Sequence, residues 1–392
     1  MRRLSRLGLL WPALAVAVAA IAAVAVSSGN TSAATRWTAN AGGGRAGISV
    51  DMFMPSVINI NEGDSIQWNN PYEEIHTVTF LGRDKLPDLL EVVPSGTILK
   101  PPTVKFAAKA FNAAPARGTP SYDGTSFINS GILAKGSPAT SWTVTFPKAG
   151  SYPFVCIVHP FMTGVVNVLG AGVYVAPQAQ RDAEAAQQLE ATLRQGEAIA
   201  AAVRTGSTRL ANGTTSWEVV TPGAPPGIAI NRFAPARIQI GVGDTVVWNN
   251  PNPGPPHTVT FGEPPAAAVA NVPDDEIPAV VAFPVKPSQT YDGRSFYNSG
   301  IISTGPEATG GSSFSLTFPA AGTFPYICVL HIDQGMAGVV VVGGGGAGGG
   351  ITAPSTGDAG LASRSGGGLL FYAAGLALLM LAGGGAWRLR RR

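Results

Sequence analysis

Two short stretches of this 392-residue chain carry residue types that bind soft metal ions. They are Phe154-Val-Cys156-Ile-Val-His159-Pro-Phe-Met162 and Tyr326-Ile-Cys328-Val-Leu-His331-Ile-Asp-Gln-Gly-Met336, and each places a thiol, an imidazole and a thioether on one loop. A further histidine precedes each stretch in a matching context. His76 and His257 both follow a Trp-Asn-Asn-Pro segment and both open the sequence His-Thr-Val-Thr-Phe. The chain has two Cys and four His, and these two constellations use all of them.

This combination of side chains indicates one kind of chemistry above others. One thiolate and two imidazoles form a trigonal donor set, and a weak axial methionine completes the blue-copper site that transfers single electrons. In a Cys-x-x-His turn both side chains reach one ion, whereas the first histidine must come from a strand that is distant in sequence. Such a site therefore requires a β-sandwich folded around it.

Other interpretations of these residues remain open at this point. A lone buried histidine is often a satisfied core residue, and two cysteines in an exported protein often form a disulfide, here between Cys156 and Cys328. Structural zinc sites usually take four strong N, S or O ligands and no thioether. The occurrence of the whole constellation twice favours the copper interpretation.

Both repeats resemble the cupredoxin family of type 1 copper domains, which includes plastocyanin and azurin. The first loop resembles that of amicyanin, because Met162 lies three residues after His159, and the second has the longer plastocyanin-like spacing from His331 to Met336. The resemblance implies two copper ions cycling between Cu(I) and Cu(II). One would be held by His76, Cys156, His159 and Met162, and the other by His257, Cys328, His331 and Met336.

The resemblance covers most of residues 44–172 and 216–343, which we expect to be two domains. It implies an all-β chain of two tandem Greek-key cupredoxin β-sandwiches. Both repeats are longer than small cupredoxins between the first histidine and the cysteine, by separations of 80 and 71 positions. Strand patterns recur in each repeat, and the Pro-rich residues 82–121 and 262–289 are expected to be loops that cover an end or a flank. A Tyr-Asp-Gly turn followed by Phe-x-Asn-Ser-Gly occurs in both, at 122–131 and 291–300, so this insertion belongs to the repeat.

The segments around the domains have distinct compositions. Residues 177–205 are rich in Ala, Gln, Glu and Arg, and their apolar positions predict a helical linker with Gly196 as its weak point. Ala41-Gly-Gly-Gly44 is expected to be a flexible lead-in, and residues 344–364 a Gly-rich tether.

The two ends of the chain predict a membrane protein. Residues 1–34 combine a basic start with an apolar core and read as a signal peptide or an uncleaved signal anchor. Residues 365–387 carry no charge and are long enough to form a transmembrane helix, and the basic tail 388–392 would fix its end on the cytoplasmic side. The copper domains would then lie on the extracytoplasmic face of the cell membrane. Ala353-Pro-Ser-Thr-Gly357 also resembles a sortase signal, so cell-wall attachment is an alternative.

The composition excludes several function classes. The net charge is +3 and dense basic runs occur only at the ends, so nothing supports nucleic-acid binding. Multicopper oxidases and copper nitrite reductases need histidines beyond those of type 1 sites, and a Ser-His-Asp hydrolase needs a free histidine. Because all four histidines are assigned, we expect no enzyme and no small-molecule substrate.

We therefore expect a membrane-anchored electron carrier that exchanges electrons with redox proteins through His159 and His331. The alternative is a copper-binding scaffold, sensor or storage module without electron transfer. The differing loops further suggest that the two coppers have unequal reduction potentials.

Overall fold

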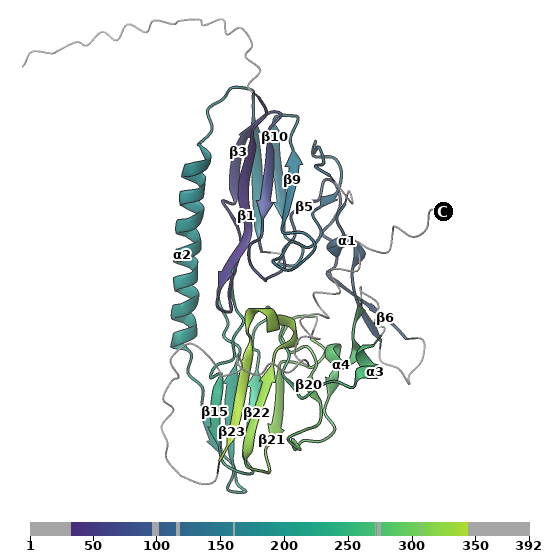
Figure 1. Ribbon diagram of the computed structural model, residues 1–392, viewed down its shortest axis with the longest axis vertical. Helices are drawn as coiled ribbons and strands as arrows, with labels where there is room; N and C mark the ends of the chain where they lie inside the picture. Colours follow the sequence, from purple (N-terminus) through teal and green to yellow (C-terminus); the bar gives the residue numbers. More distant parts are fainter. Residues whose placement is uncertain are drawn as a thin grey trace, which may run out of the picture. The chain divides into compact units, whose positions relative to one another are not determined.

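A computed structural model describes residues 33–95, 102–114, 118–159, 161–270, 272, 276–306 and 308–343, most of which lie in or between β-strands (Figure 1). The predicted signal segment 1–34, apart from its last two residues, lies outside the described residues, as do the tether 344–364, the apolar segment 365–387 and the tail 388–392. Among the residues described, no helix combines the length and the apolar character that crossing a bilayer requires.

The first repeat forms two facing sheets. One sheet has the strand order β14-β2-β1-β4-β9, comprising β14 (Ile228–Ile230), β2 (Ile48–Met54), β1 (Arg36–Arg45), β4 (Ser65–Asn69) and β9 (Ser141–Thr145). The other has the order β3-β11-β10-β5-β8, comprising β3 (Val57–Asn61), β11 (Thr163–Leu169), β10 (Gly150–Val155), β5 (Thr79–Phe80) and β8 (Ile128–Asn129). Parallel pairs β1–β4 and β3–β11 adjoin antiparallel ones, so both sheets are mixed.

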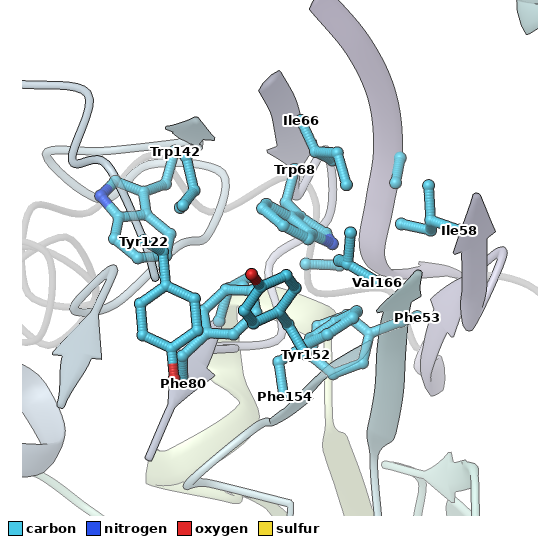
Figure 2. Packing of buried hydrophobic residues seen from close by; sticks show 14 of the residues in the cluster. Phe53, Ile58, Ile66, Trp68, Phe80, Tyr122, Trp142, Tyr152, Phe154 and Val166 are labelled. Carbon is cyan, nitrogen blue, oxygen red and sulfur yellow. The ribbon is translucent and has the colours of Figure 1, made fainter. Parts of the chain in front are cut away.

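Alternating apolar residues build the core between these sheets. In β4 the side chains of Ile66 and Trp68 are buried while their neighbours are partly exposed, as expected for a strand with one face inward. Trp68 meets Phe154 edge-on, and their ring centroids lie 5.2 Å apart. Figure 2 shows these rings together with Phe53 and Phe80 at the centre of the sandwich.

The second repeat has the same arrangement around Trp248, Phe261 and Tyr326. Its first sheet has the order β12-β13-β16-β21, comprising β12 (Ser207–Arg209), β13 (Thr215–Val220), β16 (Thr245–Asn249) and β21 (Ser313–Thr317). Its second has the order β15-β23-β22-β17-β20-β19, comprising β15 (Arg237–Ile240), β23 (Ala337–Val342), β22 (Gly322–Ile327), β17 (Thr260–Phe261), β20 (Tyr297–Ser299) and β19 (Pro284–Val285).

The two long insertions are not simple loops. They contain β6 (Leu90–Val93), β7 (Thr103–Phe106), α1 (Ala108–Phe111), α3 (Ala266–Val269), β18 (Glu276–Ile277) and α4 (Ala279–Ala282). Strands β6, β7 and β18 form one small sheet, so the insertion of one repeat pairs with that of the other. The sequence gives no sign of this pairing because strands of two to four residues are too short to show a period.

A direct strand pairing also joins the two repeats. Strand β14 of the second repeat pairs antiparallel with β2 of the first, with Ala229 opposite Ser49. The flanking backbone bonds are reciprocal: Asp51 N–H donates to the Gly227 carbonyl at 3.0 Å, and Asn231 N–H donates to the Gly47 carbonyl at 2.8 Å. We call this pairing of β2 with β14 the seam.

Helix α2 (Gln178–Ala202) lies within the range where the sequence predicts a helix, and it packs over the seam. Leu193 of the helix joins a buried cluster with Ile48 of β2 and Ile230 of β14. Gly196 is a contact point rather than a weak point. A Cβ added there would lie 2.7 Å from Ile48, so the glycine allows the close approach of helix and strand.

The expectation of a flexible lead-in at residues 41–44 is wrong, because these residues belong to strand β1. The sheet of the first repeat therefore begins at Arg36, before the predicted boundary at 44. The glycines are required by close packing. A Cβ on Gly42 would lie 2.2 Å from the Nε2 atom of His76, and one on Gly44 would lie 2.2 Å from the ring of Tyr72. A bulge between Ala41 and Gly43 accompanies this approach.

Candidate metal centre

The first candidate centre brings together His76, Cys156 and His159. The Cys156 Sγ atom lies 3.9 Å from Nδ1 of His76 and 3.8 Å from Nδ1 of His159. The two Nδ1 atoms are 3.1 Å apart. Three candidate donor atoms thus surround one point, and they belong to three of the four residues predicted for this site.

The second candidate centre repeats this geometry with His257, Cys328 and His331. The Cys328 Sγ atom lies 3.8 Å and 3.5 Å from the two Nδ1 atoms, which are 3.2 Å apart. Both cysteines are buried and free, and each faces its own pair of histidines. The alternative of a disulfide between Cys156 and Cys328 is therefore wrong for this structure, in which both cysteines are free.

Strand ends position the donor residues. His76 forms an isolated bridge with Leu133, and His257 forms the equivalent bridge with Ile302. Each cysteine directly follows the strand that delivers it, β10 or β22. The candidate ligands thereby come together in each repeat, although the first histidine lies more than 70 positions from the cysteine in sequence.

The two methionines lie on the same loops as the cysteines and are almost fully buried. The Cys156 N–H donates to the Met162 carbonyl at 2.9 Å, and the Cys328 N–H donates to the Met336 carbonyl at 3.0 Å. Both loops are therefore closed by the same backbone bond. The longer second loop contains the 3₁₀ segment η1 (Val329–Gln334) and the left-handed residue Gly335, which take up its two extra residues.

The surroundings of Cys156 favour its ionised form. Burial opposes ionisation of the thiol, but contacts with His159 and His76 outweigh burial and lower its pKa to about 5. The backbone N–H of Thr77 also donates to Sγ at 3.3 Å. The pKa of Cys328 is lowered in the same way, against burial, by His331 and His257. The thiolate is the form that binds metals.

A buried polar network ties each centre to its insertion. The Ile157 N–H donates to the Thr77 hydroxyl, which contacts the hydroxyl of Thr79, and that hydroxyl donates to Asn129. The Asn129 amide group in turn donates to three carbonyls around α1. Thr258, Thr260 and Asn298 repeat the arrangement beside α4.

This network was missed in the sequence analysis, although its signal was present. The repeated Phe-x-Asn-Ser-Gly segment contains both asparagines, and the alternation after each first histidine sets its threonines apart from the apolar face. Val78 and Phe80 enter the core, whereas Thr77 and Thr79 are buried in the polar network. The insertions are thus bound to the loops that carry the cysteines.

Two buried carboxylates lie beside the histidine rings. Asp51 lies 3.9 Å from Nε2 of His76 and 3.9 Å from Nε2 of His159. Glu74 lies 3.7 Å from Nε2 of His159 and 4.0 Å from Nε2 of His331, so it reaches both centres. Burial opposes ionisation of Glu74, but His331, His159 and His76 lower its pKa to about 2. No sequence motif marks either acid.

The surface exposure of the two centres differs. The His159 side chain is 20% exposed and Phe161 beside it is 80% exposed, whereas the His331 side chain is only 7% exposed. The expectation that His331 reaches the surface is therefore wrong. Its ring faces Glu74 of the first repeat, because the seam brings the two centres toward each other.

The donor set fits copper better than zinc. Each centre offers one thiolate and two imidazole nitrogens, with a methionine on the same loop and no fourth strong ligand among the described residues. Structural zinc sites favour four strong ligands, whereas thiolate with imidazole and thioether is typical of type 1 copper. When bound, copper would supply a one-electron redox couple at each centre.

Comparison with known proteins gives an independent result for the second repeat. Residues 228–343 match the family model of copper binding proteins of the plastocyanin/azurin family. The chain is 31% identical to the chloroplastic plastocyanin of Fritillaria agrestis over 134 residues, which is 33% of this chain and 62% of that protein. It is 29% identical to plastocyanin of Scenedesmus fuscus over 118 residues, which is 30% of this chain and 91% of that protein.

Solved structures similar to the chain include variants of amicyanin. A reduced Cu(I) form at pH 4 matches with 17% sequence identity over 34% of this chain and 82% of that chain, at a TM-score of 0.20. An oxidised variant of amicyanin matches at 16% identity with the same coverage and the same TM-score. The match to the family model of copper binding proteins lies in the second repeat of this mostly β chain.

Proposed function

We propose that the protein is an electron carrier with two type 1 copper centres in two tandem cupredoxin domains. Each centre would hold one copper ion through two histidines and a cysteine, with Met162 or Met336 as the weak axial ligand. The observation that carries the proposal is the convergence of two Nδ1 atoms and one Sγ atom within 4 Å of one another at both centres. The similarity to plastocyanins supports the choice of copper and of electron transfer.

We infer that redox partners exchange electrons at the first centre. His159 is partly exposed there and Phe161 offers an apolar side chain to a partner, while His331 is buried. In this assignment all four histidines of the chain would be copper ligands, so we propose an electron carrier and not an enzyme. The partners would be one-electron redox proteins.

The experiment that tests this function is a Cu(II) titration of the full chain in mild detergent. We would follow the visible thiolate-to-copper absorption and the EPR spectrum, with Cys156→Ala and Cys328→Ala as single-site variants. Two equivalents of intensely blue copper, with one lost in each variant, would support the proposal. A colourless copper complex would refute it and favour the scaffold or sensor function.

We also propose that residues 365–387 anchor the chain in the cell membrane with both centres on the extracytoplasmic face. The proposal rests on the uncharged run and the basic tail 388–392. Cell fractionation of the full chain and of a form ending at Gly343 would test it. If residues 1–34 are absent from both forms and both still sediment equally with membranes, this anchor is refuted. An N-terminal peptide from the mature protein would show whether residues 1–34 are removed.

A further inference from the structure

Among the described residues, the carboxylates within 4.0 Å of the histidine rings of both centres come from the first repeat. Asp51 lies on β2 and Glu74 lies two residues before His76, so both belong to one sandwich. Asp51 faces the rings of His76 and His159, which are both in the first centre. Glu74 faces one ring from each centre.

The second repeat has neutral residues at the equivalent positions. Equivalent residues of the two repeats are 180 positions apart in this region, as Trp68 and Trp248 are. The residue equivalent to Asp51 is therefore Asn231. The residue two before His257, which corresponds to Glu74, is Pro255. The second repeat instead supplies amide groups, since Asn231 and Gln334 donate to Glu74 at 3.2 Å and 2.7 Å.

No lysine or arginine of the described part of the chain forms an ion pair with either acid. The ion-pair contacts of Asp51 and Glu74 are all with histidine rings, and the other hydrogen-bond partners of the Glu74 carboxylate are Ser49, Asn231 and Gln334. One oxygen of Asp51 and Nε2 of His76 are buried and have no hydrogen-bond partner, and they lie 3.9 Å apart. A small movement of either side chain, or one bridging water, would complete a bond between this carboxylate and the metal-binding histidine.

A buried carboxylate beside a copper-binding imidazole acts on the two redox states unequally. It stabilises the more positive Cu(II) state more than Cu(I), and water screens the interaction little in the interior. Glu74 acts on both centres and therefore shifts both in the same direction. Asp51 acts on the first centre only, so it is the acid that distinguishes them.

Resting on the proposed function, we propose that Asp51 makes the first centre the one with the lower reduction potential, and that Glu74 lies on the route by which an electron passes from His159 to His331. In this step the first centre is oxidised by one electron and the second is reduced by one. No proton moves and no bond is formed or broken. Electrons received at the exposed first centre then collect at the buried second centre. Asp51 and Glu74 are positioning residues, because they act through the histidines.

The experiment compares the two single-copper proteins, Cys328→Ala for the first centre and Cys156→Ala for the second. Spectroelectrochemical titration of the full chain gives each reduction potential. We expect the first centre to be lower by at least about 59 mV, which corresponds to a tenfold preference of the electron for the second centre. Equal potentials at two blue centres, or a lower potential at the second, would overturn this inference and leave the proposed function intact.

Two variants, each replacing an acid by the amide of nearly the same size, distinguish the effects of Asp51 and Glu74. In the Cys328→Ala background, Asp51→Asn should shift electron occupancy of the first centre at least about tenfold toward the reduced state, whereas in the Cys156→Ala background it should change little. Glu74→Gln should shift both centres in the same direction. Equal responses of both centres to Asp51→Asn, or none at either, would contradict the assigned role of Asp51. Absence of blue copper from the parent would refute the proposed function, and this inference with it.

A second readout does not depend on redox activity. In the Cu(I)-loaded protein, proton NMR detects the Nε2–H groups of the histidines. Asp51→Asn should increase solvent exchange at His76 and His159 and leave His257 unchanged. If all three rings respond alike, the variant has perturbed the fold generally, and the assigned role of Asp51 is rejected.

Discussion

Gly42 offers a direct test of how the first centre is positioned. Its φ of 86° lies in the left-handed region, and a Cβ there would lie 2.2 Å from Nε2 and 2.3 Å from Cδ2 of His76. The ring cannot turn away freely because it is fully buried and faces Asp51, Cys156 and His159. The substitution Gly42→Ala therefore has to displace the ring, the strand or both.

The magnitude follows from two contributions. An alanine in the left-handed region costs about 1–2 kcal/mol of stability. Ordinary carbon contacts lie at about 3.5–4.0 Å, so the ring of His76 has to move by roughly 1 Å or more. Ligand distances in metal sites tolerate only about 0.2 Å. We expect Gly42→Ala to weaken copper binding at the first centre by at least about 100-fold and to leave the second centre unchanged.

Gly63 provides the matched control. It has nearly the same φ, 87°, but a Cβ there meets nothing within 4 Å. Gly63→Ala should lose the same 1–2 kcal/mol in urea unfolding and keep its full blue absorption. The assay is a competitive copper titration of both variants in the Cys328→Ala background. Equal copper affinities in the two variants would refute the reasoning about His76.

Three further predictions concern the surroundings of the centres. Asn129→Leu leaves three carbonyls without their donor and should lower the free energy of unfolding by about 3 kcal/mol. The control Asn167→Ala, on the exposed side of β11, should change it by less than about 0.5 kcal/mol. Urea unfolding curves would measure both, and similar losses would contradict the role of the network. Ile230→Ala should lower the free energy of unfolding by about 3 kcal/mol, because it opens a cavity under α2. The control Val57→Ala, at an exposed position, should lower it little. A loss below about 1 kcal/mol for Ile230→Ala would mean that the seam is not packed as described. In metal-free protein carrying Cys328→Ala, the ultraviolet thiolate absorbance of Cys156 should appear with a midpoint near pH 5. Copper affinity should fall below that pH, because a proton then has to leave the thiol before the metal binds. A midpoint near the ordinary thiol pKa of 9.0 would be inconsistent with the contacts to His76 and His159.

The histidines and cysteines of each candidate centre could be grouped from the sequence because each lies in a short local motif. Cys156 and His159 share one turn, and His76 begins the segment His-Thr-Val-Thr-Phe, which occurs in both repeats. The strand patterns that recur in the two repeats include β4 and β16, in which every second residue is buried. The burial pattern of a strand repeats every two residues, so these elements can be predicted from a single sequence.

Features that depend on the contact between the repeats could not be predicted in this way. Neither Asp51 nor Glu74 belongs to a recognisable motif. The fold of the first repeat brings Asp51 to the rings of its own centre, and the seam brings Glu74 to the ring of His331 as well. Gly42 reads as part of a linker because a run of glycines is typical of flexible segments, and its contact with His76 depends on a bulge in β1. The burial of His331 likewise follows from the neighbouring repeat and not from its own loop.

The seam has a consequence for how this molecule differs from a pair of separate subunits. Ser49 lies opposite Ala229, its equivalent in the second repeat, and the flanking backbone bonds are reciprocal, so the strands are related by a local two-fold axis. Two identical subunits meeting through such an axis would form an isologous interface, with the same residue at both equivalent positions. Joining the repeats covalently removes that requirement. Position 51 is aspartate while position 231 is asparagine, so one substitution alters one centre and leaves its counterpart as it was.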